Sequence, residues 1–375
     1  MNKRLLIATD SFLPRWDGIS RFLSEIIPEL KSSFSITVVA PKFPGKVPNI
    51  EGVQIVTVPT FKFRIGDYNP PRFATQLIDE LVSNSDLVWV HSIGPIGGTA
   101  LRCANKHSVK AVSFVHSLEW ELVPKSLPRA PLLKIPTYII MKYIARNLYN
   151  KADLIMAPSD DVLSILESNR IKPKKVVVPV GVCVKKFFPP ESKAKAKRRL
   201  GLDPHTFVIG FCGRVAREKN IPTLFKAFLQ VNHDFPQSRL MIVGAGVPAL
   251  NKKLSHPNVI QVGSTNNVLK YLQAMDVYVL PSLTETSSLS TMEAMACGLP
   301  VIVTPVGSMK FYIDDGKNGF FFPKRDSQAL RQRIEALMLK PGLRKRSGAA
   351  ARYTIESHHL WEHTSRQIKR ILLDL

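Results

Sequence analysis

Short apolar segments alternate with helical patterns along this chain, and the series runs through twice. In the first half, the apolar segments lie at 5–8, 36–40, 53–58, 87–90, 111–115 and 154–157. The series begins again at 207–212 and continues at 240–244, 259–262, 277–280 and 301–304. Short, fully apolar strands that alternate with helices are typical of a parallel sheet covered on both faces. The pattern therefore predicts an α/β protein with two doubly wound, Rossmann-like domains.

The length of the chain agrees with two domains. Its 375 residues exceed one ordinary core, and two domains of roughly 150–200 residues are the natural division. Segment 179–197, between the two series, is rich in proline and lysine, as a connection would be. We place the first domain at 1–185 and the second at 186–357. Because ligands of such folds bind at the carboxyl ends of the strands, we expect the site in a cleft between the domains.

The formal charge of +23 is spread over the whole chain. Residues 1–190 hold 25 Lys+Arg and 15 Asp+Glu, a net of +10, which leaves 27 and 14, a net of +13, for the rest. Such a field favours anionic partners, namely lipid headgroups, phosphorylated small molecules or nucleic acid. A nucleic-acid-binding protein would explain the charge, but the basic residues are dispersed and no stacking-aromatic motif accompanies them. We therefore expect no nucleic-acid partner.

The residues also bear on location and cofactors. The first ten residues do not resemble a signal peptide, and no run of about 18 apolar residues occurs. The sequence has no Asp-x-Asp, and its cysteines show no metal-ligand spacing. We expect a protein of the reducing cytoplasm that needs neither a metal nor another cofactor. The four cysteines lie at positions 103, 183, 212 and 297.

Segment 281–300 carries the most specific chemistry. A loop with Glu285 follows a strand, three hydroxyl residues follow at 286–288, and a helix then runs until Gly298 stops it. Backbone N–H groups at such a helix start can bind an anion such as a diphosphate. The carboxylate of Glu293, two turns deeper, can accept hydrogen bonds from a diol such as ribose. The alternative is an ordinary loop-to-helix turn with two solvated glutamates.

Glu285-x7-Glu293, followed by Ala-Met-Ala-Cys-Gly-Leu-Pro, resembles the signature of family 4 of the retaining glycosyltransferases, which have the GT-B fold. The resemblance implies that Glu285 lies by the donor sugar and that Glu293 binds the ribose. It further implies that the diphosphate is held by the backbone amides of Ser287, Ser288 and Leu289. Many members have glycine after the first glutamate, where this chain has Thr286. The transferred sugar therefore stays open among glucose, galactose and mannose.

Other segments of the second half fit the same family. Gly213-Arg-Val-Ala-Arg-Glu-Lys-Asn220 follows a strand, and its Arg214 and Lys219 can clamp two phosphates as charge-assisted donors. The family has a similar Gly-Arg-x4-Lys motif, whose cations neutralise the leaving diphosphate, which leaves Arg217 as a bystander. The resemblance also implies that loops beside the nucleotide contain Gly244, Gly246 and Gly263.

In the first half the resemblance is weaker. Asp17-Gly18 stands where the family usually has Gly-Gly, which implies that the amides of Gly18 and Ile19 face the donor phosphate or the acceptor. His116 follows a strand and resembles the family's histidine that hydrogen-bonds a sugar hydroxyl. Glu119 is a candidate for contact with the acceptor. The family's interdomain motif at 179–187 is altered by Val180 and Cys183, and the helical segment 358–375 resembles the helix that packs back on the first domain.

Segment 131–149 has the composition of a helix that binds a membrane surface. Apolar and aromatic residues alternate there with Lys134, Lys142 and Arg146. A helix of this composition can lie on a membrane, with its cations at the headgroup level and its apolar face inward. The alternative is a helix packed on the core with a solvated basic face.

The sequence thus predicts a hexosyltransferase that moves a sugar from a UDP- or GDP-linked donor to an acceptor hydroxyl with retention. Glu285, His116, Arg214 and Lys219 are the candidate catalytic residues. We expect a peripheral enzyme on the cytoplasmic face of the membrane, with a lipid acceptor. A transferase with a soluble or polysaccharide acceptor, and a non-catalytic protein that binds nucleotide sugars, remain as alternatives.

Overall fold

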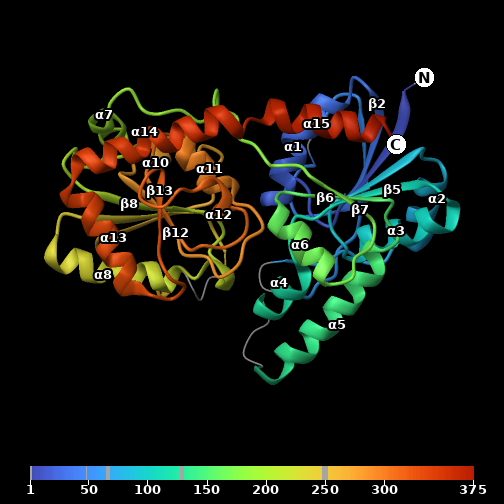
Figure 1. Ribbon diagram of the computed structural model, residues 1–375, viewed down its shortest axis with the longest axis horizontal. Helices are drawn as coiled ribbons and strands as arrows, with labels where there is room; N and C mark the ends of the chain where they lie inside the picture. The colour runs from blue at the N-terminus through green and yellow to red at the C-terminus, as the bar shows by residue number, and fades with distance from the viewer. Residues whose placement is uncertain (1, 48, 65–67, 127–130, 247–251) are drawn as a thin grey trace. The chain divides into compact units, whose positions relative to one another are not determined.

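The chain forms two compact units in the computed structural model, which describes residues 2–47, 49–64, 68–126, 131–246 and 252–375 (Figure 1). One unit contains Met1–Val180 and Trp361–Leu375, and the other contains Gly181–Leu360. The division falls at 180 rather than at the expected 185, because Val182 already pairs with Leu360 inside the second unit. Each unit is described by itself below.

The first unit is built on a seven-stranded parallel sheet in the order β3-β2-β1-β4-β5-β6-β7. Its strands are β1 Lys3–Ala8, β2 Phe34–Pro41, β3 Val53–Val58, β4 Leu87–Val90, β5 Lys110–Phe114, β6 Leu154–Ala157 and β7 Lys174–Val177. The sequence predicted six of these strands. It missed β7, an edge strand that begins with two lysines and is only partly buried. The order reverses between β1 and β4, where doubly wound folds place their ligands.

Helices cover this sheet, and the last of them begins later than the sequence suggested. Their bounds are α1 Gly18–Leu30, α2 Thr75–Ser83, α3 Pro95–His107, α4 Glu119–Ser126, α5 Pro131–Tyr149, α6 Asp160–Ser168 and α15 Trp361–Leu373. Before α2 the chain is extended, and the Arg72 amide donates to the Pro59 carbonyl. Helix α15 begins at Trp361 and packs on α1, where the Trp361 and Phe22 rings meet edge to face at 5.6 Å (Figure 1).

The second unit repeats the design with a six-stranded parallel sheet in the order β10-β9-β8-β11-β12-β13. Its strands are β8 Val208–Cys212, β9 Arg239–Val243, β10 Val259–Gly263, β11 Val277–Leu280, β12 Val301–Val303 and β13 Gly319–Phe321. Its helices are α7 Lys193–Arg198, η1 Arg217–Lys219, α8 Ile221–Asp234, α10 Leu269–Ala274, α11 Leu289–Ala296, α12 Met309–Tyr312, α13 Ser327–Leu339 and α14 Pro341–His358. The prediction of two doubly wound domains is therefore confirmed.

Two general properties bear on function. Within the described ranges, none of the helices has the length and apolar character needed to cross a membrane. Over the same residues, no group of three or more His, Cys, Asp or Glu side chains could hold a metal ion. The four cysteines are free thiols, and all except Cys183 are buried.

Candidate active site

In the second unit, the loops that follow β8 and β11 are joined by an ion pair between Lys219 and Glu285. The Lys219 Nζ lies 2.5 Å from the Glu285 Oε1, and the Ser282 hydroxyl donates to the same oxygen at 2.7 Å. Both charged side chains are mostly buried. Two residues that lie far apart in the sequence thus meet at the carboxyl edge of the sheet.

Arg214 belongs to the same cluster and is held by a carboxylate that the sequence analysis missed. Its Nη2 lies 2.6 Å from the Glu218 Oε1, and the Glu218 carbonyl accepts a hydrogen bond from the Leu283 amide at 2.7 Å. Glu218 is buried. Its spacing of four residues from Arg214 within a tight turn could have indicated the pair. Arg214 and Lys219 are therefore fixed in place by carboxylates before any ligand binds.

The Glu285 loop is also supported from behind by a glycine. Gly307 has a φ of +57°, and a Cβ there would lie 2.3 Å from the Glu285 carbonyl oxygen. The Ser308 amide donates to the Thr286 carbonyl at 2.8 Å. Only glycine permits this approach, so Gly307 shapes the loop although it belongs to none of the recognised motifs.

Helix α11 begins where the hydroxyl residues predicted. Ser288 is its N-cap, and the Ser288 Oγ accepts from the Thr291 amide at 3.3 Å and from the Thr291 hydroxyl at 2.9 Å. Among the described residues, the buried Ser287 hydroxyl has no hydrogen-bond partner. A buried hydroxyl without a partner is costly, and a ligand oxygen at this helix start would satisfy it.

Glu293 is buried on α11, two turns after the cap. Its charge acts on the Cys212 thiol at the end of β8, where burial raises the pKa and Glu293 raises it further. Glu293 therefore lies close enough to the end of β8 for its charge to act there. The helix ends as expected, because Gly298 follows it with a φ of +71°.

The glycines of the Gly-x-Gly loop have a packing reason that the sequence did not reveal. A Cβ on Gly244 would lie 2.0 Å from the Gly213 carbonyl oxygen, and one on Gly246 would lie 2.1 Å from the Val215 carbonyl oxygen. The Gly244 amide donates to the Gly263 carbonyl at 2.9 Å. Both glycines therefore let this loop lie against the segment that carries Arg214.

Substituting Gly246 with alanine should lower the free energy of unfolding by about 2–3 kcal/mol, because the added methyl group meets backbone that cannot move aside cheaply. Urea unfolding of the variant measures the change. Gly18→Ala is the control, since a Cβ there meets nothing within 4 Å. Equal stability of the two variants would contradict the packing explanation.

In the first unit, the Ile19 amide, which is predicted to face the donor phosphate or the acceptor, already has a hydrogen-bond partner within the protein. The Asp17 Oδ1 accepts from the Ile19 amide at 3.0 Å and from the Ser20 amide at 3.1 Å, while the Ser20 hydroxyl accepts from the Asp17 amide at 2.8 Å. This is a capping box. The aspartate that replaces the family's first glycine thus takes the hydrogen bond expected for a ligand. Gly18 is the first residue of α1, and its predicted contact with the donor phosphate or the acceptor stays a prediction.

His116 lies at the carboxyl end of β5, beside a second histidine that the sequence analysis missed. The His116 Nε2 is 2.8 Å from the Nδ1 of His91, which follows β4. The His116 ring stacks on Phe114, with centroids 4.4 Å apart. Burial lowers the pKa of His116 to about 3, against an opposing effect of Asp17. His116 is therefore neutral at physiological pH. His91 also follows the end of a strand, so the same sequence signal could have indicated it.

Glu119 is held by its own helix pair. The Tyr149 hydroxyl lies 3.1 and 3.0 Å from the two Glu119 carboxylate oxygens, and the Ser117 hydroxyl lies 3.3 Å from one of them. Burial raises the pKa of Glu119 to about 7. Its hydrogen bonds connect the start of α4 to the end of α5, so the structure gives Glu119 a role within the fold besides the predicted acceptor contact.

The raised pKa of Glu119 makes stability depend on pH. Because folded Glu119 binds its proton more tightly than unfolded Glu119 between pH 4.5 and 7, this residue lowers the free energy of unfolding by about 3 kcal/mol as the pH rises over that range. The buried His91 and His116 have lowered pKa values and change stability in the opposite direction, so the Glu119 contribution is measured as a difference between variants. In urea unfolding at pH 5 and pH 8, the stability of Glu119→Gln relative to the parent protein should rise by about 3 kcal/mol from the lower to the higher pH. Glu80→Gln, at an exposed site on α2, should show no such change. An equal difference at both pH values for Glu119→Gln would contradict the assignment.

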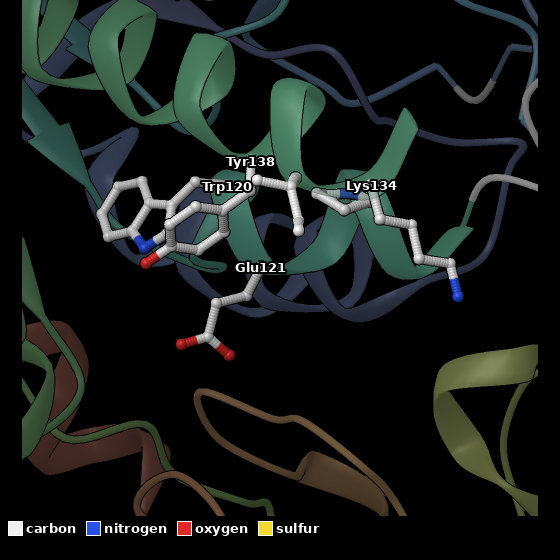
Figure 2. Close-up of a pocket in the computed structure, with 6 residues that line it drawn as sticks. Trp120, Glu121, Lys134 and Tyr138 are labelled. Carbon is white, nitrogen blue, oxygen red and sulfur yellow. The ribbon is translucent and has the colours of Figure 1, made fainter. Parts of the chain in front are cut away.

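The predicted basic residues of 131–149 lie on one helix, α5, as expected. Lys134 and Tyr138 line a cavity of about 380 Å³ between α4 and α5, together with Trp120, Glu121, Pro124 and Ile135. Figure 2 shows the Trp120 and Tyr138 rings side by side, with the Glu121 carboxylate and the Lys134 amine turned away from them. The Lys142 Nζ lies 5.7 Å from the centre of the Tyr138 ring. Arg146 is half-buried one turn later.

Comparison with known proteins shows which families the two units resemble. The family described as Glycosyltransferase Family 4 matches residues 16–186, and the family described as Glycosyl transferases group 1 matches residues 206–340. The chain is 26% identical over 268 residues to alpha-monoglucosyldiacylglycerol synthase of Acholeplasma laidlawii, and this match spans 64% of each chain. It is 25% identical over 394 aligned positions, 98% of each chain, to GDP-mannose-dependent alpha-(1-6)-phosphatidylinositol monomannoside mannosyltransferase of Mycolicibacterium smegmatis.

Solved structures agree on the fold. Sucrose-phosphate synthase of Thermosynechococcus elongatus superposes with a TM-score of 0.81 at 19% identity and covers 100% of this chain and 99% of its own. WaaG, a glycosyltransferase involved in lipopolysaccharide biosynthesis, superposes with a TM-score of 0.75 at 16% identity, over 98% of this chain and 99% of its own. The two family matches together extend over most of the sequence. The chain is therefore a glycosyltransferase of the GT-B fold and belongs to glycosyltransferase family 4.

Proposed function

We propose that this enzyme transfers a hexose from a UDP- or GDP-linked donor to a hydroxyl group of a membrane lipid, with retention of configuration and without a metal ion. The observation that carries the lipid acceptor is the exposed apolar face of α5. The names of two relatives support it, since one describes a diacylglycerol glycosyltransferase and the other a phosphatidylinositol mannoside mannosyltransferase. The enzyme would then work at the cytoplasmic face of a membrane.

The proposed binding of the sugar donor rests on Arg214 and Lys219 of the second unit, each of which is held by a carboxylate. When a nucleotide sugar binds, its diphosphate takes hydrogen bonds from Arg214 and Lys219, and Glu293 accepts from the ribose. The bond between the anomeric carbon and the phosphate oxygen breaks, and the cations stabilise the departing negative charge. The acceptor oxygen forms the new bond, and its proton goes to the leaving phosphate. These two cations supply the stabilisation that a metal ion gives in other transferases.

Helix α5 supports the membrane contact because only its last turns are buried. Ala145, Leu148 and Tyr149 are buried against the unit. In the turns before them, one residue per turn exposes a large apolar surface: Ile135 by 72%, Ile139 by 60% and Tyr143 by 62%. Leu133, Ile140 and Ile144 widen this face. An exposed apolar area of this size marks an interaction site, and Lys134 and Lys142 suit the level of anionic headgroups.

A second segment of the first unit also exposes apolar and basic side chains that suit a membrane surface. The chain after β3 pairs with itself through Thr60 and Pro71, and exposes Phe63 by 55% and Phe73 by 68%. The exposed cations Lys62, Arg64 and Arg72 accompany them. Segment 59–73 leaves the carboxyl end of β3, and α4 follows the carboxyl end of β5. Because the strands are parallel, both segments leave the same edge of the sheet.

A soluble acceptor is the second candidate. The chain is 30% identical over 235 residues to D-inositol 3-phosphate glycosyltransferase of Stackebrandtia nassauensis, a match that covers 56% of this chain and 52% of that protein. A soluble phosphorylated acceptor would also suit the positive charge. Transfer that proceeds at full rate without vesicles would favour this candidate.

A thermal-shift panel of UDP- and GDP-linked hexoses tests the donor half. We expect one of them to raise the unfolding temperature, because a ligand at 100 times its Kd stabilises the folded state by about 2.7 kcal/mol. Glu293→Ala should abolish the shift. Arg217→Ala is the control and should preserve the shift, because Arg217 is exposed and lies close to Lys219 in the sequence. A panel without any stabilising nucleotide sugar would contradict the proposal.

A further inference from the structure

His91 and His116 form a hydrogen-bonded pair inside the first unit. The His91 Nδ1 and the His116 Nε2 are 2.8 Å apart. His91 is buried, and its ring lies among the rings of Phe22, Trp89 and Phe114, with centroids 5.7, 4.1 and 6.2 Å away. Burial lowers the pKa of both histidines well below the usual value, so both rings are neutral.

Two neutral rings can share this hydrogen bond in only two ways. Each neutral imidazole has one N–H donor and one bare acceptor nitrogen. Either His91 donates from Nδ1 and His116 accepts at Nε2, or His116 donates from Nε2 and His91 accepts at Nδ1. The first arrangement places the remaining proton of His116 on Nδ1, and the second leaves that nitrogen bare.

The surroundings of His91 decide between the two. Its other ring nitrogen, Nε2, is buried and has no hydrogen-bond partner among the described residues. A buried N–H without an acceptor is rarer than a buried acceptor without a donor. The first arrangement leaves only a bare acceptor at His91 Nε2, whereas the second leaves an N–H there. The neighbouring Trp89 ring, whose centroid lies 4.1 Å from that of His91, could offer an N–H only a weak acceptor.

We propose that His91 is a positioning residue that donates its Nδ1–H to His116 and thereby fixes the Nδ1–H tautomer of His116. His116 then acts as a hydrogen-bond donor at Nδ1 and cannot act there as a base. This inference rests on the proposed function, in which the partner of His116 is an oxygen of the transferred sugar. A neutral donor at that place holds a sugar hydroxyl through its lone pair and does not remove a proton from it.

Nitrogen-15 NMR of the histidine-labelled full chain at neutral pH tests the tautomers directly. The couplings between ring nitrogens and carbon-bound protons distinguish Nδ1–H from Nε2–H, and spectra of His91→Asn and His116→Asn assign the signals. We expect both histidines as Nδ1–H tautomers. An Nε2–H tautomer of His116 would overturn the inference, whether or not the enzyme is active. If the donor sugar that stabilises the protein leaves the His116 signal in place, the proposed sugar contact fails while the tautomer stands.

Kinetics of two His91 variants supply the second test. Asparagine can place an N–H near the position of the histidine Nδ1, whereas leucine fills similar space without a donor. We expect His91→Leu to lower kcat about tenfold with little change in the donor KM, and His91→Asn to recover most of the loss. Equal kcat values for the two variants, at equal unfolding temperatures, would show that His91 serves packing alone and would overturn the inference.

Discussion

Replacing Lys219 with alanine should lower kcat about 1,000-fold, the size of effect seen when one preorganised group that stabilises developing charge is removed. Lys219 is fixed by the Glu285 carboxylate at 2.5 Å and is mostly buried. In the transition state the leaving diphosphate gains negative charge, and Lys219 is in place to meet it without reorganisation. Steady-state transfer from the preferred nucleotide sugar measures the loss.

A matched control lies within the same turn. Arg217 is exposed and belongs to η1 with Lys219, so Arg217→Ala should leave kcat within about twofold. Lys219→Ala also leaves the Glu285 carboxylate without its cation, which should cost about 1–3 kcal/mol of stability. The double variant Lys219→Met with Glu285→Gln removes both charges and should restore stability without restoring activity. Comparable activity of Lys219→Ala and Arg217→Ala would contradict the leaving-group role.

Serine at Ile135, Ile139 and Tyr143 together should weaken binding to anionic vesicles at least 100-fold. Burying one large apolar side chain contributes about 1.5–3 kcal/mol, so three of them exceed the 2.7 kcal/mol that a 100-fold change requires. Flotation with phosphatidylglycerol vesicles at low salt measures the loss. The exposure of these side chains keeps the effect on folding small.

The second unit offers a control of equal size. Phe311, Leu339 and Tyr353 are exposed by 60%, 63% and 70%, which is close to the values on α5. Serine at these three positions should leave vesicle binding unchanged. Glutamine at Lys134 and Lys142 should weaken binding to anionic vesicles by about 1 kcal/mol per residue and leave binding to neutral vesicles unaffected. Flotation that survives the α5 substitutions, or absence of flotation from both kinds of vesicle at low salt, would contradict the membrane contact.

The sequence was sufficient where local chemistry alone decides the structure. The Ser288 cap, the helix through Glu293 and the stop at Gly298 follow from residue types within one turn of one another. Most of the strands could be predicted because burial on both faces makes them apolar without interruption, but β13, with only the three residues Gly319–Phe321, was missed. Edge strand β7 lacks that signal, since its first two residues are lysines and the strand is only partly buried.

Features that depend on residues distant in the sequence could not be predicted. The sequence placed Lys219 and Glu285 at strand ends but gave no sign that they pair, because 66 positions separate them. Gly307 and the His91–His116 pair are set by the packing of loops that leave different strands. The family pattern also gave no sign that Asp17, in place of the usual glycine, caps α1 and takes the Ile19 amide as a hydrogen-bond donor.

For helix α5, the hydrophobic periodicity of the sequence could not predict the environment of the helix. A surface helix is usually recognised by one apolar and one polar face, but α5 is apolar both in its buried last turns and in the exposed turns before them. Periodicity therefore cannot separate a buried helix from a membrane-surface helix in this segment. The separation requires the exposure of Ile135 and Ile139 in the folded unit.

One measurement tests the central claim most directly. The enzyme is incubated with radiolabelled UDP- and GDP-linked hexoses in the presence of vesicles that contain diacylglycerol and anionic phospholipids, and the products are partitioned between organic and aqueous phases. The account predicts label from one donor in the organic phase, dependent on Glu293 and Lys219 and insensitive to Arg217→Ala. Label that appears only in the aqueous phase, at an equal rate with and without vesicles, would contradict the lipid acceptor.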